Sequence, residues 1–194
     1  MEILVVGPVR GNVERFKGLV EVASPDLVVA IGPLGLSEPL KLGRTWFFVR
    51  GKEDSLTPLA KSDGIDMLSR VFRTKEGVTF SGISGYYDPV ASKFTRAQWV
   101  KARGKLSKRH GNAVFAEDIE ALLVPFQRAG IERLDFLVLA DSPERPPFKR
   151  VVEVTRPRYL FYPAASYRKE RVGDTVYIGL EDVDSPKGKY LLKL

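Results

Sequence analysis

The sequence predicts a layered α/β protein with mixed β-sheets, and three features predict it. Two uninterrupted apolar runs, EILVV (2–6) and DLVVAIG (26–32), are typical of strands that are covered on both faces. A segment with helical periodicity lies between them. Near the end of the chain, short strand-like segments alternate with turn residues, as antiparallel strands do. Strands that alternate with helices and then finish antiparallel indicate stacked layers of sheet and helix.

The first helix is expected to begin after Asn12, because asparagine is a good helix cap. Val13, Phe16, Leu19 and Val20 then recur at helical spacing, which gives this helix one apolar side. The helix and the two apolar runs together form one strand–helix–strand unit.

The remaining elements are expected in order along the chain. Strands are predicted at TWFFVRG (45–51), VFRT (71–74), VTFSGIS (78–84), FLVLA (136–140) and YLFY (159–162), and a second helix at EDIEALLVPFQRAG (117–130), where Pro125 is a possible kink. RVGDTVYIG (171–179) and GKYLLKL (188–194) are predicted to close the fold as an antiparallel meander. The proline-rich DSPERPPFKR (141–150) is interpreted as an extended loop, either a docking surface or a rigid connection.

The amino-acid composition excludes several classes of function and favours others. A chain of 194 residues with 44% hydrophobic residues suits a single folded domain, 1–194. The sequence has no cysteine and one histidine, His110, so zinc fingers, thiol catalysis and histidine-rich metal sites are excluded. No apolar run or leader pattern predicts a membrane span or a signal peptide. The scarcity of Cys and Met beside many charged residues favours a heat-adapted (thermophile) cytoplasmic protein. The net charge of +7 favours an anionic partner, and nucleic acid is the first candidate.

Five segments, each directly after an apolar run, carry a family resemblance. They are GPVRGN (7–12), IGPLG (31–35), VRGKED (49–54), LVLADSP (137–143) and YLFYPAASY (159–167). In this order they resemble the strand-end motifs of the calcineurin-like metallophosphoesterases, closest to the RNA lariat-debranching enzymes and their non-catalytic relatives. SGISGYY (81–87) also resembles the segment before the recognition region of those enzymes. The resemblance implies a four-layer sandwich in which two mixed sheets are flanked by helices.

The residues at the family's metal-ligand positions depart from the motifs. These degenerate positions are Pro8, Arg10, Pro33, Lys52, Ala140, Ala164 and Ser166, and the position of the catalytic histidine aligns with Glu53. A two-metal centre needs carboxylate and imidazole ligands, whereas proline and alanine have no donor atom and arginine and lysine bring cations. We therefore expect no metal, no cofactor and no catalytic residue, and interpret the chain as a pseudoenzyme.

The remodelled strand ends have two interpretations. Arg10 and Lys52 are expected on neighbouring strand ends, with Arg50 nearby and with the helix N-terminus at Asn12, and together they are candidates to bind a phosphate. Alternatively, Glu53 and Asp54 pair with Lys52 and Arg10 and close the pocket, with Asp141 in the same network. The prolines are also compatible with loops that are merely rigid.

A basic insertion at about 88–112 is the second candidate site. Its seven cations are Lys93, Arg96, Lys101, Arg103, Lys105, Lys108 and Arg109, and no acidic residue lies among them. Thr95 and Gln98 form a capping-box pattern, and Trp99, Ala102 and Leu106 give the helix an apolar side. Clustered cations beside Phe94 and Trp99 suit phosphate contacts and base stacking, although an ordinary solvated face remains an alternative. His110 is interpreted as a polar loop residue.

The sequence thus favours a catalytically inactive metallophosphoesterase-fold protein that binds nucleic acid, RNA because of the resemblance, or a phosphate group. Tyr86 and Tyr87 are either base-stacking residues or a buried rim. The alternative is a protein-interaction scaffold or a regulatory subunit of an active partner. A remote alternative is a phosphodiesterase with metal-free chemistry that uses Glu53, Asp54 or Asp141.

Overall fold

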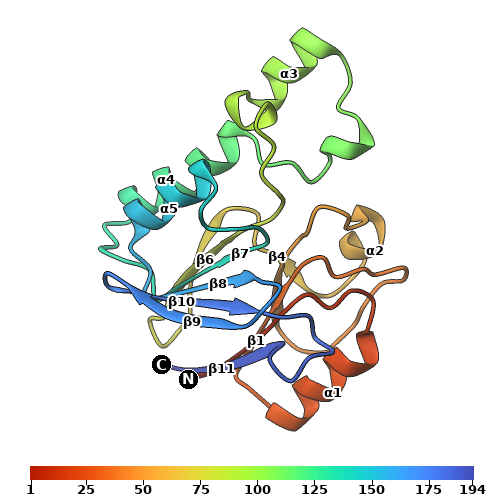
Figure 1. Cartoon of the computed structure of the whole chain (residues 1–194), viewed down its shortest axis with the longest axis vertical. Coiled ribbons are helices and arrows are strands. Elements are labelled where there is room, and N and C mark those ends of the chain that lie inside the picture. Colours follow the sequence, from red (N-terminus) through yellow and green to blue (C-terminus); the bar gives the residue numbers. More distant parts are fainter.

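The computed structural model describes residues 1–194 and shows two β-sheets packed face to face (Figure 1). The first sheet has the spatial order β11 (Lys189–Lys193), β1 (Glu2–Val6), β2 (Leu27–Ile31), β3 (Trp46–Val49) and β4 (Ile65–Asp66). The second has the order β5 (Arg70–Arg73), β6 (Thr79–Ile83), β7 (Phe136–Leu139), β8 (Tyr159–Pro163), β10 (Thr175–Leu180) and β9 (Arg168–Val172). The inner strands of both sheets are parallel; β11 in the first sheet and β5 and β9 in the second are antiparallel edge strands, whereas the edge strand β4 is parallel.

Helices cover the outer face of each sheet. The first sheet is covered by α1 (Val13–Ala23) and α2 (Leu56–Ala60), and the second by α4 (Ala116–Arg128) and α5 (Pro146–Thr155). The remaining helix, α3 (Arg96–Arg103), lies with the 3-10 turns η1 (Ala91–Lys93) and η2 (Lys108–His110) in a segment that projects away from the layers (Figure 1).

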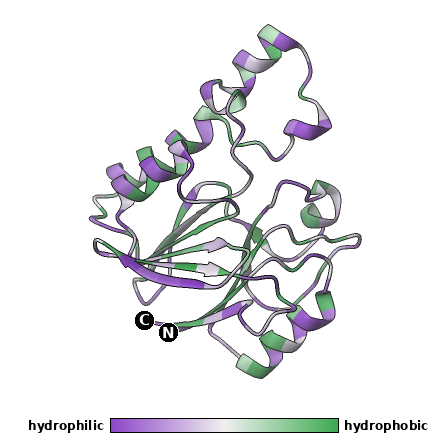
Figure 2. Ribbon diagram, in the orientation of Figure 1, coloured by the Kyte–Doolittle hydropathy of each residue, from purple (hydrophilic) through white to green (hydrophobic).

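The apolar side chains form three layers of core, one between each pair of structural layers. Ile3 and Val5 point between the two sheets, whereas Leu4 and Val6 point toward α1, because successive side chains of a strand face opposite sides. Central strands such as β1 are therefore apolar on both faces, whereas the edge strand β9 is exposed and hydrophilic along its length (Figure 2). The predicted fold class, a four-layer sandwich of two mixed sheets flanked by helices, is confirmed.

The expected first helix is confirmed in detail. It begins at Val13, and the side-chain oxygen of the cap residue Asn12 accepts a hydrogen bond from the backbone N–H of Arg15 at 3.1 Å. Phe16, Leu19 and Val20 are its buried residues, as their spacing predicted.

The predicted closing meander is wrong. Strands β9 and β10 do form a hairpin around Gly173 and Asp174, but β10 also pairs parallel with β8, and β11 leaves for the other sheet, where it pairs antiparallel with β1. The loop between β10 and β11 lies against the end of β1, where the N–H of Gly7 donates to the carbonyl of Gly188. This contact holds the start of β11 beside the first sheet.

The proline-rich segment is a helix rather than an extended loop. Helix α5 begins at Pro146. Proline suits the first helical positions because the backbone N–H groups there have no partner within the helix, so no helical hydrogen bond is lost. Its apolar residues Phe148, Val151 and Val152 pack into the core beside α4. Helix α2 and strand β4 were not predicted, because both are too short to show periodicity. No helix in the structure is both long enough and apolar enough to cross a membrane.

Candidate functional site

The loops that follow β1, β2, β3, β6 and β7 meet at one edge of the sandwich, because parallel strands present their carboxyl ends together. They enclose a cavity of about 370 Å³, here called the central pocket. Its lining is Arg10, Gly32, Pro33, Lys52, Glu53, Tyr86, Tyr87, Ala140, Asp141, Arg145 and Pro163. A second cavity of about 550 Å³, the side pocket, shares Arg10 and Pro163 with it.

The structure brings the degenerate ligand positions to these pockets. Arg10, Pro33, Lys52 and Ala140 line the central pocket, and Pro8 and Ala164 line the side pocket. Ser166 lies beside Ala164 in a third, smaller cavity of about 240 Å³. Positions that are far apart in the sequence therefore surround one region of the strand ends.

The residues at this edge do not fit a two-metal centre. Proline and alanine side chains offer no donor atom, and the cations Arg10 and Lys52 repel metal ions. No group of three His, Asp or Glu side chains in the structure lies close enough to hold a metal ion.

We expect protein purified after growth with manganese or zinc to hold far less than one equivalent of tightly bound metal, and not to hydrolyse phosphodiesters. The reason is the missing donor atoms at Pro8, Pro33, Ala140 and Ala164. Elemental analysis, combined with a chromogenic phosphodiester assay, measures both. Near-stoichiometric metal together with turnover is the contradicting result.

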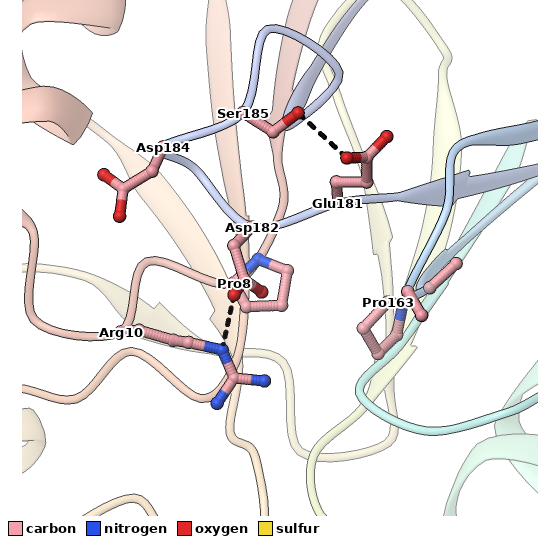
Figure 3. Close-up of a pocket in the computed structure, with 9 residues that line it drawn as sticks. Pro8, Arg10, Pro163, Glu181, Asp182, Asp184 and Ser185 are labelled. Carbon is pink, nitrogen blue, oxygen red and sulfur yellow. Dashed lines mark hydrogen bonds and ion pairs between the residues drawn. The ribbon is translucent and has the colours of Figure 1, made fainter.

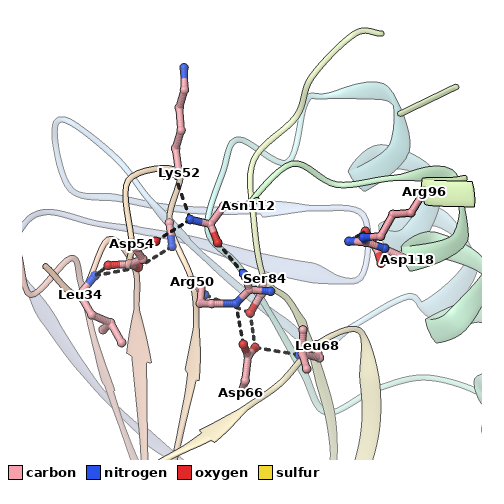
Figure 4. Close-up of polar contacts among 11 residues, drawn as sticks. Leu34, Arg50, Lys52, Asp54, Asp66, Leu68, Ser84, Arg96, Asn112 and Asp118 are labelled. Atoms are coloured by element: carbon pink, nitrogen blue, oxygen red, sulfur yellow. Dashed lines mark hydrogen bonds and ion pairs between the residues drawn. The ribbon is translucent and has the colours of Figure 1, made fainter. Parts of the chain in front are cut away.

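Asp54 joins two of the pocket loops, a role that was not predicted. One carboxylate oxygen accepts the N–H groups of Leu34 and Gly35 at 2.8 and 2.9 Å, and the other accepts those of Gly51 and Leu34 at 2.8 and 3.0 Å (Figure 4). The side chain is buried and is not part of the pocket lining. The expected pairing of Asp54 with Lys52 or Arg10 is therefore wrong.

Arg50 is not a phosphate ligand, contrary to the sequence-based expectation. It is buried, its Nε pairs with the carboxylate of Asp66 at 2.6 Å, and a terminal nitrogen donates to the side-chain oxygen of Asn112 (Figure 4). Asn112 in turn donates to the backbone carbonyls of Lys52 and Asp54 at 3.1 and 2.8 Å. This network ties the end of the basic insertion to the loop after β3.

Arg10 pairs with Asp182 rather than with the acidic residues after β3. Its Nε donates to Asp182 at 2.9 Å (Figure 3). The backbone of Arg10 has a left-handed conformation, with φ at 46°, which non-glycine residues rarely adopt. Its N–H donates to the carbonyl of Pro33 at 3.1 Å, so this conformation is fixed by the loop after β2.

Asn12 is not available as a phosphate ligand. Its oxygen caps α1, and its amide nitrogen donates to the carboxylate of Asp184, which places an acidic group at this helix end. The expected contribution of the Asn12 side chain to a phosphate site therefore has no support, because the fold brings an acidic residue from the loop after β10 to this helix end.

Lys52 and Arg145 lie over tyrosine rings in the central pocket. The ammonium nitrogen of Lys52 is 5.0 Å from the ring centre of Tyr86, and the guanidinium carbon of Arg145 is 5.7 Å from that of Tyr87. Burial, followed by the charge of Asp88, raises the pKa of Tyr86. Its protonated hydroxyl donates to the carbonyl of Arg109 at 2.8 Å.

Asp141 does not join a salt-bridge network, as the alternative interpretation expected. Its two carboxylate oxygens accept the backbone N–H groups of Tyr87 and Ser142 at 2.8 and 2.7 Å. Neither Asp141 nor the neighbouring Glu53 forms an ion pair with a cation of the pocket. The expected salt-bridge closure of the pocket is wrong.

Residues 93–110, here called the basic protrusion, are mounted rigidly on the body. The predicted capping box is confirmed: Thr95 and Gln98 exchange side-chain to backbone hydrogen bonds at 3.1 and 2.9 Å. Trp99 is buried, with its ring centre 4.6 Å from that of His110 and 5.9 Å from that of Phe115. The protrusion is thus a fixed element.

Two expectations for the protrusion need correction. Trp99 is buried and therefore has no free face for base stacking, whereas Ala102, expected on the apolar side, is exposed. Arg96 is not an uncompensated cation, because it pairs with Glu117 at 2.9 Å and Asp118 at 2.8 Å. Burial opposes the charge of Arg96, but the hydrogen bonds and charges of Asp118 and Glu117 outweigh it and raise the pKa of Arg96.

Six cations of the protrusion remain exposed and form no ion pair with a carboxylate. They are Lys93, Lys101, Arg103, Lys105, Lys108 and Arg109. The guanidinium of Arg103 lies over the Trp99 ring at 4.8 Å. His110 is the last residue of η2, with Nδ1 2.6 Å from the hydroxyl oxygen of Ser107 and with its ring against Trp99.

Comparison with known proteins identifies a shared fold but no family and no function. No protein-family model matches the sequence, and no curated protein matches it. Among solved structures, TT1561 of Thermus thermophilus matches with a TM-score of 0.65 and 12% identity, over 94% of this chain and 89% of that chain. A second solved structure matches with a TM-score of 0.63 and 12% identity, over 99% of this chain and 98% of that one. At this identity the likeness shows a shared fold, the four-layer sandwich of two mixed sheets described above.

Proposed function

We propose that this chain is a catalytically inactive cytoplasmic protein of metallophosphoesterase fold that binds RNA through the basic protrusion. The observation that carries the proposal is the set of six exposed cations without carboxylate partners on one projecting element. Such cations bind phosphates with release of counterions. The net charge of +7 favours the same partner class.

Rigid mounting supports the proposal. The capping box at Thr95, the pairing of Arg96 with α4 and the buried Trp99 hold the protrusion in one orientation. Cations on a preformed surface lose less conformational freedom on binding than cations on a disordered tail. The preference for RNA over DNA rests on the resemblance to the lariat-debranching enzymes, in which the equivalent region lies beside the branched RNA.

The absence of catalysis is proposed from ligand chemistry. The degenerate positions supply no metal donors, and the acidic residues of the central pocket are Glu53 and Asp141, the latter held by backbone N–H groups. Asp54 is buried and does not line the pocket. A metal-free phosphodiesterase that uses Asp54 therefore has no support from the geometry.

Replacing Lys101, Arg103, Lys105 and Lys108 with glutamine is expected to flatten the salt dependence of RNA binding. The slope of log affinity against log salt should fall by about 3 units, since each lost phosphate contact removes about 0.7–0.9. The fold should survive, because exposed charges contribute little to stability. Fluorescence anisotropy with a single-stranded RNA at several salt concentrations measures the slope, and thermal melts verify folding.

A matched control removes four exposed cations elsewhere, at Lys41, Lys61, Lys75 and Arg128. It lowers the net charge equally, so it separates the protrusion from a general charge effect. An unchanged slope in the folded protrusion variant, or an equal fall in the control, contradicts RNA binding through the protrusion and favours the scaffold alternative.

A further inference from the structure

The central pocket holds more donor groups than its own acceptors satisfy. Arg10, Lys52 and Arg145 come from three separate loops and line one cavity of about 370 Å³. That volume lies in the range of small-molecule sites, roughly 300–1,000 Å³. The only carboxylates in the lining are Glu53 and Asp141, and neither pairs with any of the three cations.

Each cation is held in place and keeps free donors. Arg10 uses Nε alone for Asp182, which leaves its two terminal amino groups without a hydrogen bond to the protein. The head groups of Lys52 and Arg145 rest over the rings of Tyr86 and Tyr87, a contact that orients a cation without using its N–H donors.

Of the two carboxylates in the lining, Asp141 is engaged by the backbone and Glu53 forms no ion pair with a cation. Both oxygens of Asp141 accept backbone N–H groups, and Asp54 is buried between the loops. Neither lining carboxylate therefore satisfies a cation of the pocket, although all three cations line the cavity. A ligand that complements this arrangement supplies anionic oxygen acceptors.

The pocket lies at the base of the basic protrusion. The hydroxyl of Tyr86 donates to the carbonyl of Arg109, and the side chain of Asn112 donates to the carbonyl of Lys52. One bound strand can therefore contact both the protrusion cations and the central pocket.

We propose that the central pocket binds the terminal phosphate of the RNA strand held by the protrusion, without a metal ion. A phosphomonoester has three free oxygens and a charge of about −1.5 to −2 at neutral pH, whereas an internal phosphodiester has two free oxygens and one charge. Three cations with free donors match the phosphomonoester. The proposal rests on the proposed RNA binding and adds the chemical group that the strand end must carry.

The test compares one RNA sequence with a 5′-phosphate, a 3′-phosphate or two hydroxyl ends, each as a competitor of a labelled strand in fluorescence anisotropy. We expect one phosphorylated form to bind about tenfold more tightly than the hydroxyl form, since charge-assisted hydrogen bonds are lost with the phosphate. Arg10→Gln and Arg145→Gln should each abolish this difference between the phosphorylated and hydroxyl forms. Lys149→Gln, an exposed residue on α5 outside the pocket, should keep it.

Equal affinities for the three RNAs, or a preference that survives both arginine substitutions, overturn the proposal. The protrusion variant with four glutamines distinguishes the two sites, because it should weaken all three RNAs alike and keep their ratio. If no RNA binds, the proposed function fails. Calorimetry with adenosine 5′-monophosphate then still tests whether the central pocket binds a phosphomonoester. Binding to the wild type that is lost in Arg145→Gln supports a phosphomonoester site, and no binding to the wild type overturns it.

Discussion

Replacement of Asp54 by alanine is expected to lower the free energy of unfolding by about 3–5 kcal/mol. The substitution leaves three N–H groups near the pocket without an acceptor, and each unsatisfied group costs roughly 1–3 kcal/mol. The three donors belong to Leu34, Gly35 and Gly51, in the loops after β2 and β3. Neither loop has another carboxylate that reaches them. A loss of this size is a large share of the stability of an ordinary domain.

Urea denaturation followed by circular dichroism measures the loss as a shift of the midpoint at unchanged slope. The matched control is Glu53→Ala, since Glu53 is the exposed neighbour of Asp54 and forms no ion pair. Its effect should stay within about 0.5 kcal/mol. Equal midpoints for the two variants contradict the role given to Asp54.

Replacement of Trp99 by alanine is expected to release the basic protrusion from the body. The buried indole packs against Phe94, Phe115 and His110, and loss of a buried tryptophan costs about 3–5 kcal/mol. Because this small cluster is separate from the three core layers, the loss should be local. Amide hydrogen exchange in α3 should accelerate at least about a hundredfold, while β1 to β3 keep their protection.

Val100→Ala provides the control on the same helix, because Val100 is exposed. It should leave the exchange rates of α3 nearly unchanged. RNA affinity should fall in the Trp99 variant although no cation is lost, since the six cations then no longer share a fixed orientation. Unchanged protection in α3 shows that Trp99 does not anchor the protrusion.

The sequence predicts the long apolar elements well because burial on both faces leaves a direct trace in the residue pattern. Strands β1 and β2 and helix α1 are found where the pattern places them. The polar anchors of the pocket leave no such trace. Asp54 and Arg50 have the appearance of surface charges after an apolar strand, and only the fold shows that both are buried.

The same limit applies to charge. A count of cations in 93–109 cannot show that Arg96 meets Glu117 and Asp118, which follow it by about twenty residues and lie on another helix. Pairing of this kind depends on tertiary structure rather than on local spacing. The acidic partners at the start of α4 were visible in the sequence as helix N-terminal residues, but nothing in the pattern linked them to α3.

The pairing of β11 with β1 has a consequence for the way the chain is made. Glu2 faces Lys193 in this ladder, so the two paired strands lie at opposite ends of the 194 residues. During synthesis on the ribosome, β1 must keep one hydrogen-bonding edge open until β11 emerges. Throughout that interval its apolar residues, such as Ile3 and Val5, lack the cover that Leu192 provides in the finished protein. Until then β1 presents an unpaired strand edge, the kind of edge through which incompletely folded chains associate.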